Sequence, residues 1–165
     1  MADHRARIQR AGRGLLQPGE PVLASVRAAA EGSPLGALGG LVVLIALAAD
    51  QRSRAEDQGF PASMQMVLAV TDRRLVVFRK SLFPLRFRGE LPLEAIQAVS
   101  VERRGMSPRL RFVLSSRAEL TFTTYRLDHP DEFVRAFEQA REDRTRVVSP
   151  RSLSMAIPAA PPPPV

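Results

Sequence analysis

Apolar and polar residues alternate along much of this chain, and the pattern predicts a protein built mainly from β-strands. The clearest case lies at residues 66–78, where two apolar, β-rich runs flank Asp72 and Arg73. Asp favours the start of a tight turn because its carboxylate accepts hydrogen bonds from nearby backbone N–H groups. We therefore predict a hairpin over residues 64–79. The pattern also predicts strands over residues 22–29, 86–91, 96–103, 109–114 and 119–124.

One amphipathic helix is predicted after the last strand. Asp128 is placed to cap this helix, and Pro130 falls in its first turn. An apolar stripe with spacings of three and four residues follows, made by Phe133, Ala136, Phe137 and Ala140. Residues 148–165 are rich in proline and predict a disordered tail, because they lack the apolar residues that build a core.

A segment without charge interrupts the β-pattern at residues 32–49. Its second half is wholly apolar, and Ser33 with Pro34 suits a helix start, so we predict an inserted apolar helix over residues 34–58. A helix without a polar face must be covered. Its own sheet or the N-terminal segment, a second protomer, or a shallow position in a membrane could each cover it. For the second protomer, the predicted self-association surface consists of Gly36, Gly40, Leu41 and Leu44.

A membrane-spanning role for this segment is disfavoured. A span needs about 20 apolar residues, and this run is at the lower edge of that length. One crossing would also place the strands before and after it on opposite sides of the bilayer.

Composition restricts the chemistry that the 165 residues can perform. The formal net charge is +7, which favours anionic partners, and Lys80 is the one lysine. The chain has no cysteine, which excludes disulfides and thiolate chemistry and is compatible with a reducing cytoplasm. His4 and His129 are too few and too scattered for a metal site, and no nucleophile or phosphate-loop motif is present. We expect no enzyme activity, no metal and no cofactor.

A basic stretch at residues 73–88 is the main candidate for binding. It holds six cations and no acid, and an apolar loop tip lies in its middle. Such a tip ringed by cations suits an anionic membrane surface. Alternatively, the apolar tip folds back into the core and leaves the cations solvated. Nucleic acid is a disfavoured partner, because no recognition helix or stacking platform is evident. The predicted membrane- or anion-binding residues are Arg79, Lys80, Phe83, Arg86 and Arg88.

The order of these elements, together with three local motifs, resembles bacterial pleckstrin-homology-like domains of the GRAM-like kind. The motifs are the hairpin at residues 69–78, the Pro-Leu-Glu-Ala-Ile element at residues 92–96, and the last strand with its closing helix at residues 119–133. The resemblance covers roughly residues 18–146. It implies an α+β, mainly β fold, a partly open barrel or sandwich of about seven strands with a C-terminal capping helix. The apolar insert departs from the family pattern, and no phosphoinositide-binding residues carry over.

We therefore predict a basic segment at residues 1–16, the pleckstrin-homology-like domain at 17–147 and the tail at 148–165. The expected function is a non-catalytic binding or adaptor module that docks a partner protein or an anionic membrane surface. The alternative is a self-associating module that forms a homo-oligomer through the insert. The expected location is the cytoplasm, at the inner face of the membrane when docked.

Overall fold

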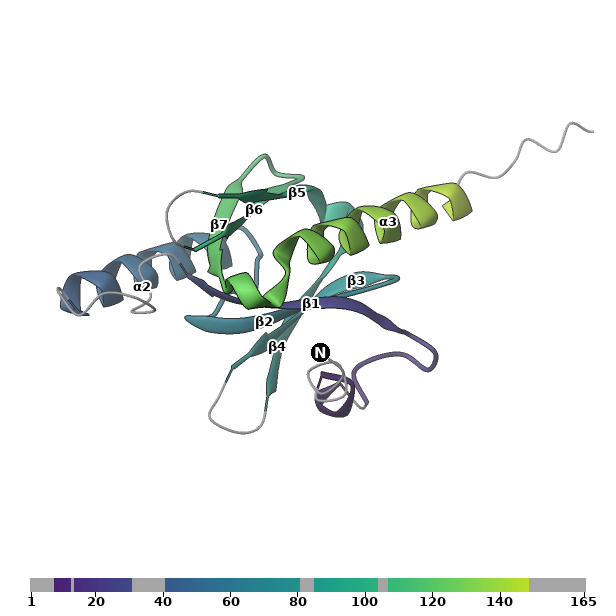
Figure 1. The fold of residues 1–165 in the computed structure, drawn as a ribbon, viewed down its shortest axis with the longest axis horizontal. Helices are drawn as coiled ribbons and strands as arrows, with labels where there is room; N and C mark the ends of the chain where they lie inside the picture. The colour runs from purple at the N-terminus through teal and green to yellow at the C-terminus, as the bar shows by residue number, and fades with distance from the viewer. Residues whose placement is uncertain (1–7, 13, 31–40, 81–84, 104–106, 149–165) are drawn as a thin grey trace, which may run out of the picture.

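The computed structural model describes residues 8–12, 14–30, 41–80, 85–103 and 107–148. The described residues form two larger helices and seven strands, labelled as in Figure 1. In chain order the elements are β1 (Val22–Ala30), α2 (Leu41–Asp57), β2 (Gln65–Thr71), β3 (Arg74–Arg79), β4 (Arg86–Pro92), η1 (Leu93–Ala95), β5 (Ile96–Glu102), β6 (Arg109–Leu114), β7 (Glu119–Thr124), η2 (Arg126–Asp128) and α3 (Pro130–Val148).

The seven strands form one open antiparallel sheet in the order β4-β3-β2-β1-β7-β6-β5. Helix α3 lies across the sheet and contacts the neighbouring strands β1 and β2 as well as β5, which lies at the edge of the sheet (Figure 1). This contact requires the sheet to curl around the helix. The predicted hairpin, the number of strands and the closing helix are confirmed.

Strand β2 is buried on both faces of the sheet. Met66, Leu68 and Val70 point into the main core, which also receives Phe133 and Phe137 of α3. Val67 and Ala69 point the other way, into a second cluster formed with the remaining residues Ile8, Val22, Val76 and Phe78. Because the chain before β1 supplies Ile8 to this cluster, the outer face of the sheet is also covered.

Helix α2 ends in a Schellman motif that fixes it to the sheet. Gly59 has a φ of +76°, its N–H donates to Glu56 O at 2.9 Å, and Phe60 N–H donates to Ala55 O at 2.8 Å. Phe60 is fully buried, and its ring lies 5.6 Å from that of Phe112 and 5.0 Å from that of Phe122. The last turn of α2 is therefore held in place by the aromatic core.

The predicted insert began at residue 34, and residues 31–40 lie outside the described part of the chain. Helical backbone is described from Leu41 onwards. What covers the apolar half of the insert therefore stays a prediction. Within the described residues, no helix combines the length and the apolar character needed to cross a bilayer.

The start of α3 differs from the sequence prediction. The Asp128 carboxylate, expected as a helix cap, accepts hydrogen bonds from the Arg27 backbone N–H at 3.0 Å and from the Arg27 guanidinium at 2.7 Å. The Arg27 guanidinium also lies over the Tyr125 ring, 4.5 Å from its centre. These contacts join β1 to the segment that leads into α3. Sequence reasoning missed them because the two partners are 101 residues apart.

Candidate anion-binding site

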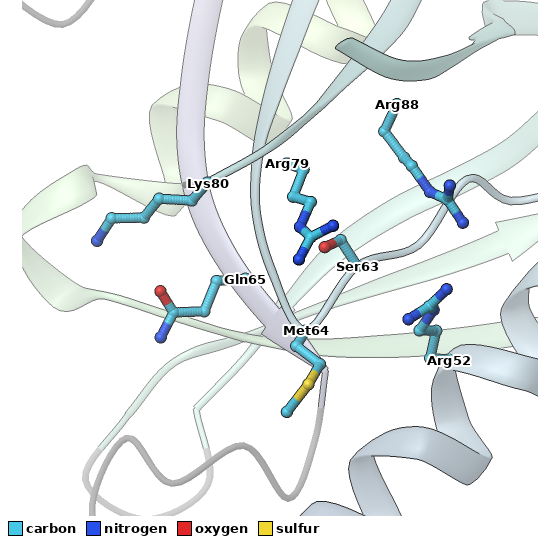
Figure 2. A pocket seen from close by; sticks show the side chains of 7 residues that line it. All are labelled: Arg52, Ser63, Met64, Gln65, Arg79, Lys80 and Arg88. Atoms are coloured by element: carbon cyan, nitrogen blue, oxygen red, sulfur yellow. The ribbon is translucent and has the colours of Figure 1, made fainter. Parts of the chain in front are cut away.

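Three of the predicted cations meet at one end of the sheet. Arg79 at the end of β3, Lys80 after it and Arg88 of β4 line a single pocket together with Arg52 of α2 (Figure 2). The pocket has a volume of about 300 Å³, and its remaining described lining comes from Ser63, Met64 and Gln65. The pocket thus combines two neighbouring strands, the segment that leads into β2, and the polar half of α2.

A β-bulge positions Arg88. Across β3 and β4, Val77 pairs with Gly89 while Phe78 pairs with Phe87, so Arg88 is an extra residue without a direct partner on β3. A bulge of this kind re-aims a side chain and increases the local twist of the strand. The bulge therefore explains why Arg88 lines the pocket.

The segment before β2 is fixed by close packing. A Cβ atom built on Gly89 would lie 2.6 Å from Pro61 Cβ, so β4 approaches this segment as closely as only glycine allows. Four residues later, Gln65 O accepts a hydrogen bond from the Lys80 N–H at 3.0 Å. Ser63 lies between these two fixed points and is held at the pocket wall.

The cations of the pocket fall into two electrostatic classes. Arg52 Nε donates to Glu56 Oε1 at 3.1 Å, and Arg88 Nη2 donates to the same oxygen. The hydrogen bonds from Arg88 and Arg52 hold the pKa of Glu56 below its ordinary value. Arg79 and Lys80 form no ion pair with any described carboxylate. Among the described residues that line the pocket, none is acidic.

A buried hydroxyl adds to this positive lining. Ser63 exposes only 7% of its surface, and its hydroxyl forms no hydrogen bond with the described residues. Among the described residues, every side-chain nitrogen or oxygen that is fully enclosed has a hydrogen-bond partner. Because the Ser63 oxygen has none, it is not fully enclosed and is accessible from the pocket. Figure 2 shows the hydroxyl on the side of Ser63 that faces Arg79.

Arg86 is not among the described residues that line the pocket. Arg86 is directly opposite Arg79 on the neighbouring strand, a like-charge pair that costs a fraction of a kcal/mol. Phe83, Gly36 and Gly40 fall outside the described residues. The predicted self-association residues that remain, Leu41 and Leu44, are described only as backbone of α2.

The predicted basic stretch is split between the two ends of the β2–β3 hairpin. Arg73 and Arg74 lie at the turn, and the length of β3 separates them from Arg79. Arg74 forms ion pairs with Glu20, with 2.7 Å between Nη2 and Oε2, and with Glu90. A run of charges that is continuous in sequence is therefore two separate sites in the fold.

Sequence reasoning missed Arg52, Glu56 and Ser63. Arg52 and Glu56 lie four residues apart on α2, which is a recognisable helical pair. No local signal places that pair beside β4, since the position of α2 depends on its C-terminal cap and on Phe60. Within the described residues, no three His, Asp or Glu side chains gather where they could hold a metal ion.

A family model described as a bacterial PH domain matches residues 16–139. The chain belongs to this family. Bacterial PH domains share the PH-like fold, whose members are generally binding modules and typically non-catalytic. No curated protein matches the chain. All residues described above as lining the pocket of this bacterial PH domain lie inside the matched range.

Proposed function

We propose that this bacterial PH domain is a non-catalytic binding module that docks the pocket end of its sheet on an anionic membrane surface. The supporting observation is the convergence of Arg52, Arg79, Lys80 and Arg88 on one pocket without a described acidic side chain in its lining. Two of these cations have no carboxylate partner among the described residues, so they are available to an external anion.

The magnitude of the electrostatic term suits reversible docking. Each cation near an anionic bilayer contributes about 1 kcal/mol, and the contribution falls off within a Debye length. Arg79 and Lys80 contribute in full, whereas Glu56 offsets part of the contribution of Arg52 and Arg88, and added salt weakens the resulting attraction. Met64 lines the same pocket, and Phe87 lies on the neighbouring strand β4, and both keep more than a third of their surface exposed. Apolar groups beside cations favour a membrane interface over bulk water.

The site requires an anionic surface, and the cytoplasmic leaflet of a membrane provides one. We therefore propose a cytoplasmic protein that is peripheral at the inner face of the membrane. An acidic partner protein is the competing occupant, and the experiment below separates the two.

Vesicle co-sedimentation tests the proposal. The intact protein should sediment with phosphatidylcholine vesicles that contain phosphatidylglycerol, and it should stay in solution with phosphatidylcholine alone. Arg79→Glu with Lys80→Glu should abolish binding, because the change reverses the two unpaired charges. A matched control is Arg117→Glu with Arg135→Glu, which changes the net charge equally at exposed positions outside the pocket. Equal loss in both variants, or no binding by the unaltered protein, would contradict membrane docking.

Self-association is the second candidate function. It is supported by a continuous helical backbone over Leu41–Asp57, the first nine residues of which are all apolar. A helix of this composition needs a covering surface, and a second copy of α2 would provide one. This role is independent of the pocket and has a separate prediction below.

A further inference from the structure

We propose that the outer edge of strand β5 is a docking surface for an extended segment, and that its occupant is residues 152–157 of this chain's own C-terminal region. The edge belongs to β5 at one end of the strand order, whereas the basic pocket lies at the β3 and β4 end. The two surfaces share no described residue, so this inference is independent of the proposed function.

The edge of β5 lacks the usual protection against pairing. As the last strand of the sheet, β5 has one edge that is not paired with a strand among the described residues. Proteins commonly protect such edges with charged side chains or proline. The opposite edge strand β4 follows this rule, with Arg86, Arg88 and Pro92. From Gln97 to Val101, β5 carries neither a charge nor a proline, so this edge is open to an added strand.

The pairing pattern shows which backbone groups of β5 point to this edge. Leu114 N–H donates to Ala118 O at 2.9 Å, so the even-numbered residues of β6 bond to β7 and the odd-numbered ones bond to β5. In the register between β5 and β6, these odd-numbered residues face the even-numbered residues of β5. Val99 and Val101 therefore direct their N–H and C=O groups outward, where an added strand would pair with them.

A groove separates this edge from helix α3. Val99, Phe137 and Glu138 are among the described residues that line a pocket of about 200 Å³. A second pocket, of about 460 Å³, lies towards the start of β5 and shares Gln97 and Arg141 with the first. Arg141 donates a hydrogen bond to Gln97 O at the bulged start of the strand. The free part of the edge therefore begins at Val99, beside the first pocket.

The course of the chain identifies the occupant. Asp131 at the start of α3 forms an ion pair with Arg103, which follows the end of β5. Thr145, near the other end of α3, lines the second pocket together with Gln97 at the start of β5. Helix α3 therefore runs antiparallel to β5. It is described as far as Val148, about one turn beyond Thr145. A chain that turns back after this point runs along β5 in the same direction.

The sequence after α3 contains one segment with the pattern of a strand. Three apolar residues alternate there with serine or alanine, and a proline stands shortly before and directly after the segment. The apolar residues are Leu153, Met155 and Ile157. They are too few to build a core of their own, but in a strand paired with β5 they would share one face. We assign that face to the groove beside α3.

Hydrogen exchange of the intact protein tests this docking. The amides of Val99 and Val101 should exchange about tenfold more slowly in the unaltered protein than in Met155→Asp, because the variant puts a charge on the face that is covered by α3. Ser154→Asp adds the same charge to the opposite face and should leave the exchange unchanged. The amide of Ser100, which bonds to β6, is the internal control. Equal exchange of Val99 and Val101 in the three proteins would overturn the proposal.

A spin label distinguishes the chain's own segment from that of a second copy. The chain has no cysteine, so Ser154→Cys provides a single labelling site. The label should broaden the amide signals of Val99 and Val101 and leave those of Arg79 and Lys80 unchanged. Broadening of isotope-labelled chains by separately spin-labelled chains would place a second copy at the edge and overturn the assignment to the chain's own segment. Absence of broadening at β5 would overturn the docking itself. Neither result affects membrane docking, because no residue of the basic pocket is changed.

Discussion

Arg88 on the edge strand β4 donates a hydrogen bond to Glu56 on α2, 32 residues away in the sequence. This contact ties the inserted helix to the strand that carries much of the predicted basic stretch. The pocket therefore depends on the position of α2 as much as on the charges of β3 and β4. Variants that move α2 without changing any charge should alter binding.

Gly59→Ala makes such a test. Gly59 has a φ of +76° and no neighbouring atom within 4 Å of an added Cβ, so the substitution strains only the backbone. We expect a loss of about 1–2 kcal/mol in the free energy of unfolding, together with weaker vesicle binding. Gly14→Ala is the control, since its φ of +85° and open surroundings match those of Gly59. Chemical denaturation should show similar losses, and equal vesicle binding by the two variants would contradict the role of α2.

Gly89→Ala tests the packing that holds the pocket wall. The new Cβ would lie 2.6 Å from Pro61 Cβ, so β4 or the segment before β2 must move. Overpacking of this kind costs about 1–3 kcal/mol, and Arg88 should move with β4. Pro61→Gly removes the opposing atoms, so the double variant should lose less stability than the sum of the single losses. Simple additivity in a double-mutant cycle would show that the two residues are not in contact.

Glu20 should make stability depend on pH. Burial alone would raise the pKa of its carboxyl, but hydrogen bonds from Arg74 and from the Gln17 backbone N–H outweigh burial and hold the pKa below its ordinary value. A carboxyl whose pKa is lower in the folded than in the unfolded state stabilises the protein at pH values above the unfolded-state pKa. This stabilisation is lost as the pH falls through the folded-state pKa.

Glu20→Gln should therefore destabilise the protein most at neutral pH, by about 3 kcal/mol, because Arg74 loses its buried partner. The difference from the unaltered protein should shrink as the solution is acidified. Thermal unfolding followed over a pH series measures both curves. A difference that stays constant from neutral to acidic pH would refute this linkage.

Self-association through the insert predicts a mass above that of a monomer. Light scattering of the intact protein at high concentration should detect it, and Gly36→Leu with Gly40→Leu should reduce it by preventing close helix approach. Arg79→Glu with Lys80→Glu should leave the mass unchanged, because these residues belong to the pocket. A monomeric mass for the unaltered protein would reject this function.

The sequence predicts the elements of the fold better than it predicts the site. The alternation at residues 109–114 and the apolar runs around Asp72 identify strands, because the periodicity reports which face is buried. The same reasoning placed Arg73, Arg74 and Arg79 in one basic stretch, although the length of β3 separates the first two from Arg79 in space. Periodicity does not report which ends of different elements meet.

The missing parts of the site are those that depend on non-local geometry. Arg88 lines the pocket through a bulge, and a bulge appears in the register of paired strands rather than in one sequence. Ser63 lies in the loop before β2, and its place at the pocket depends on the packing of Pro61 against Gly89. Arg52 reaches the pocket because the turn at Gly59 directs Phe60 into the core. Each contact joins segments that no local pattern connects.

The most direct test maps the bound surface by NMR. Backbone amides of the intact protein are followed while phosphatidylglycerol-containing bicelles are added, and phosphatidylcholine bicelles serve as the control. The account predicts changes at Ser63, Gln65, Lys80 and Arg88, with the turn at Asp72 and Arg73 at the other end of the hairpin unaffected. Changes centred on that turn, or none beyond those caused by phosphatidylcholine, would contradict docking through the pocket.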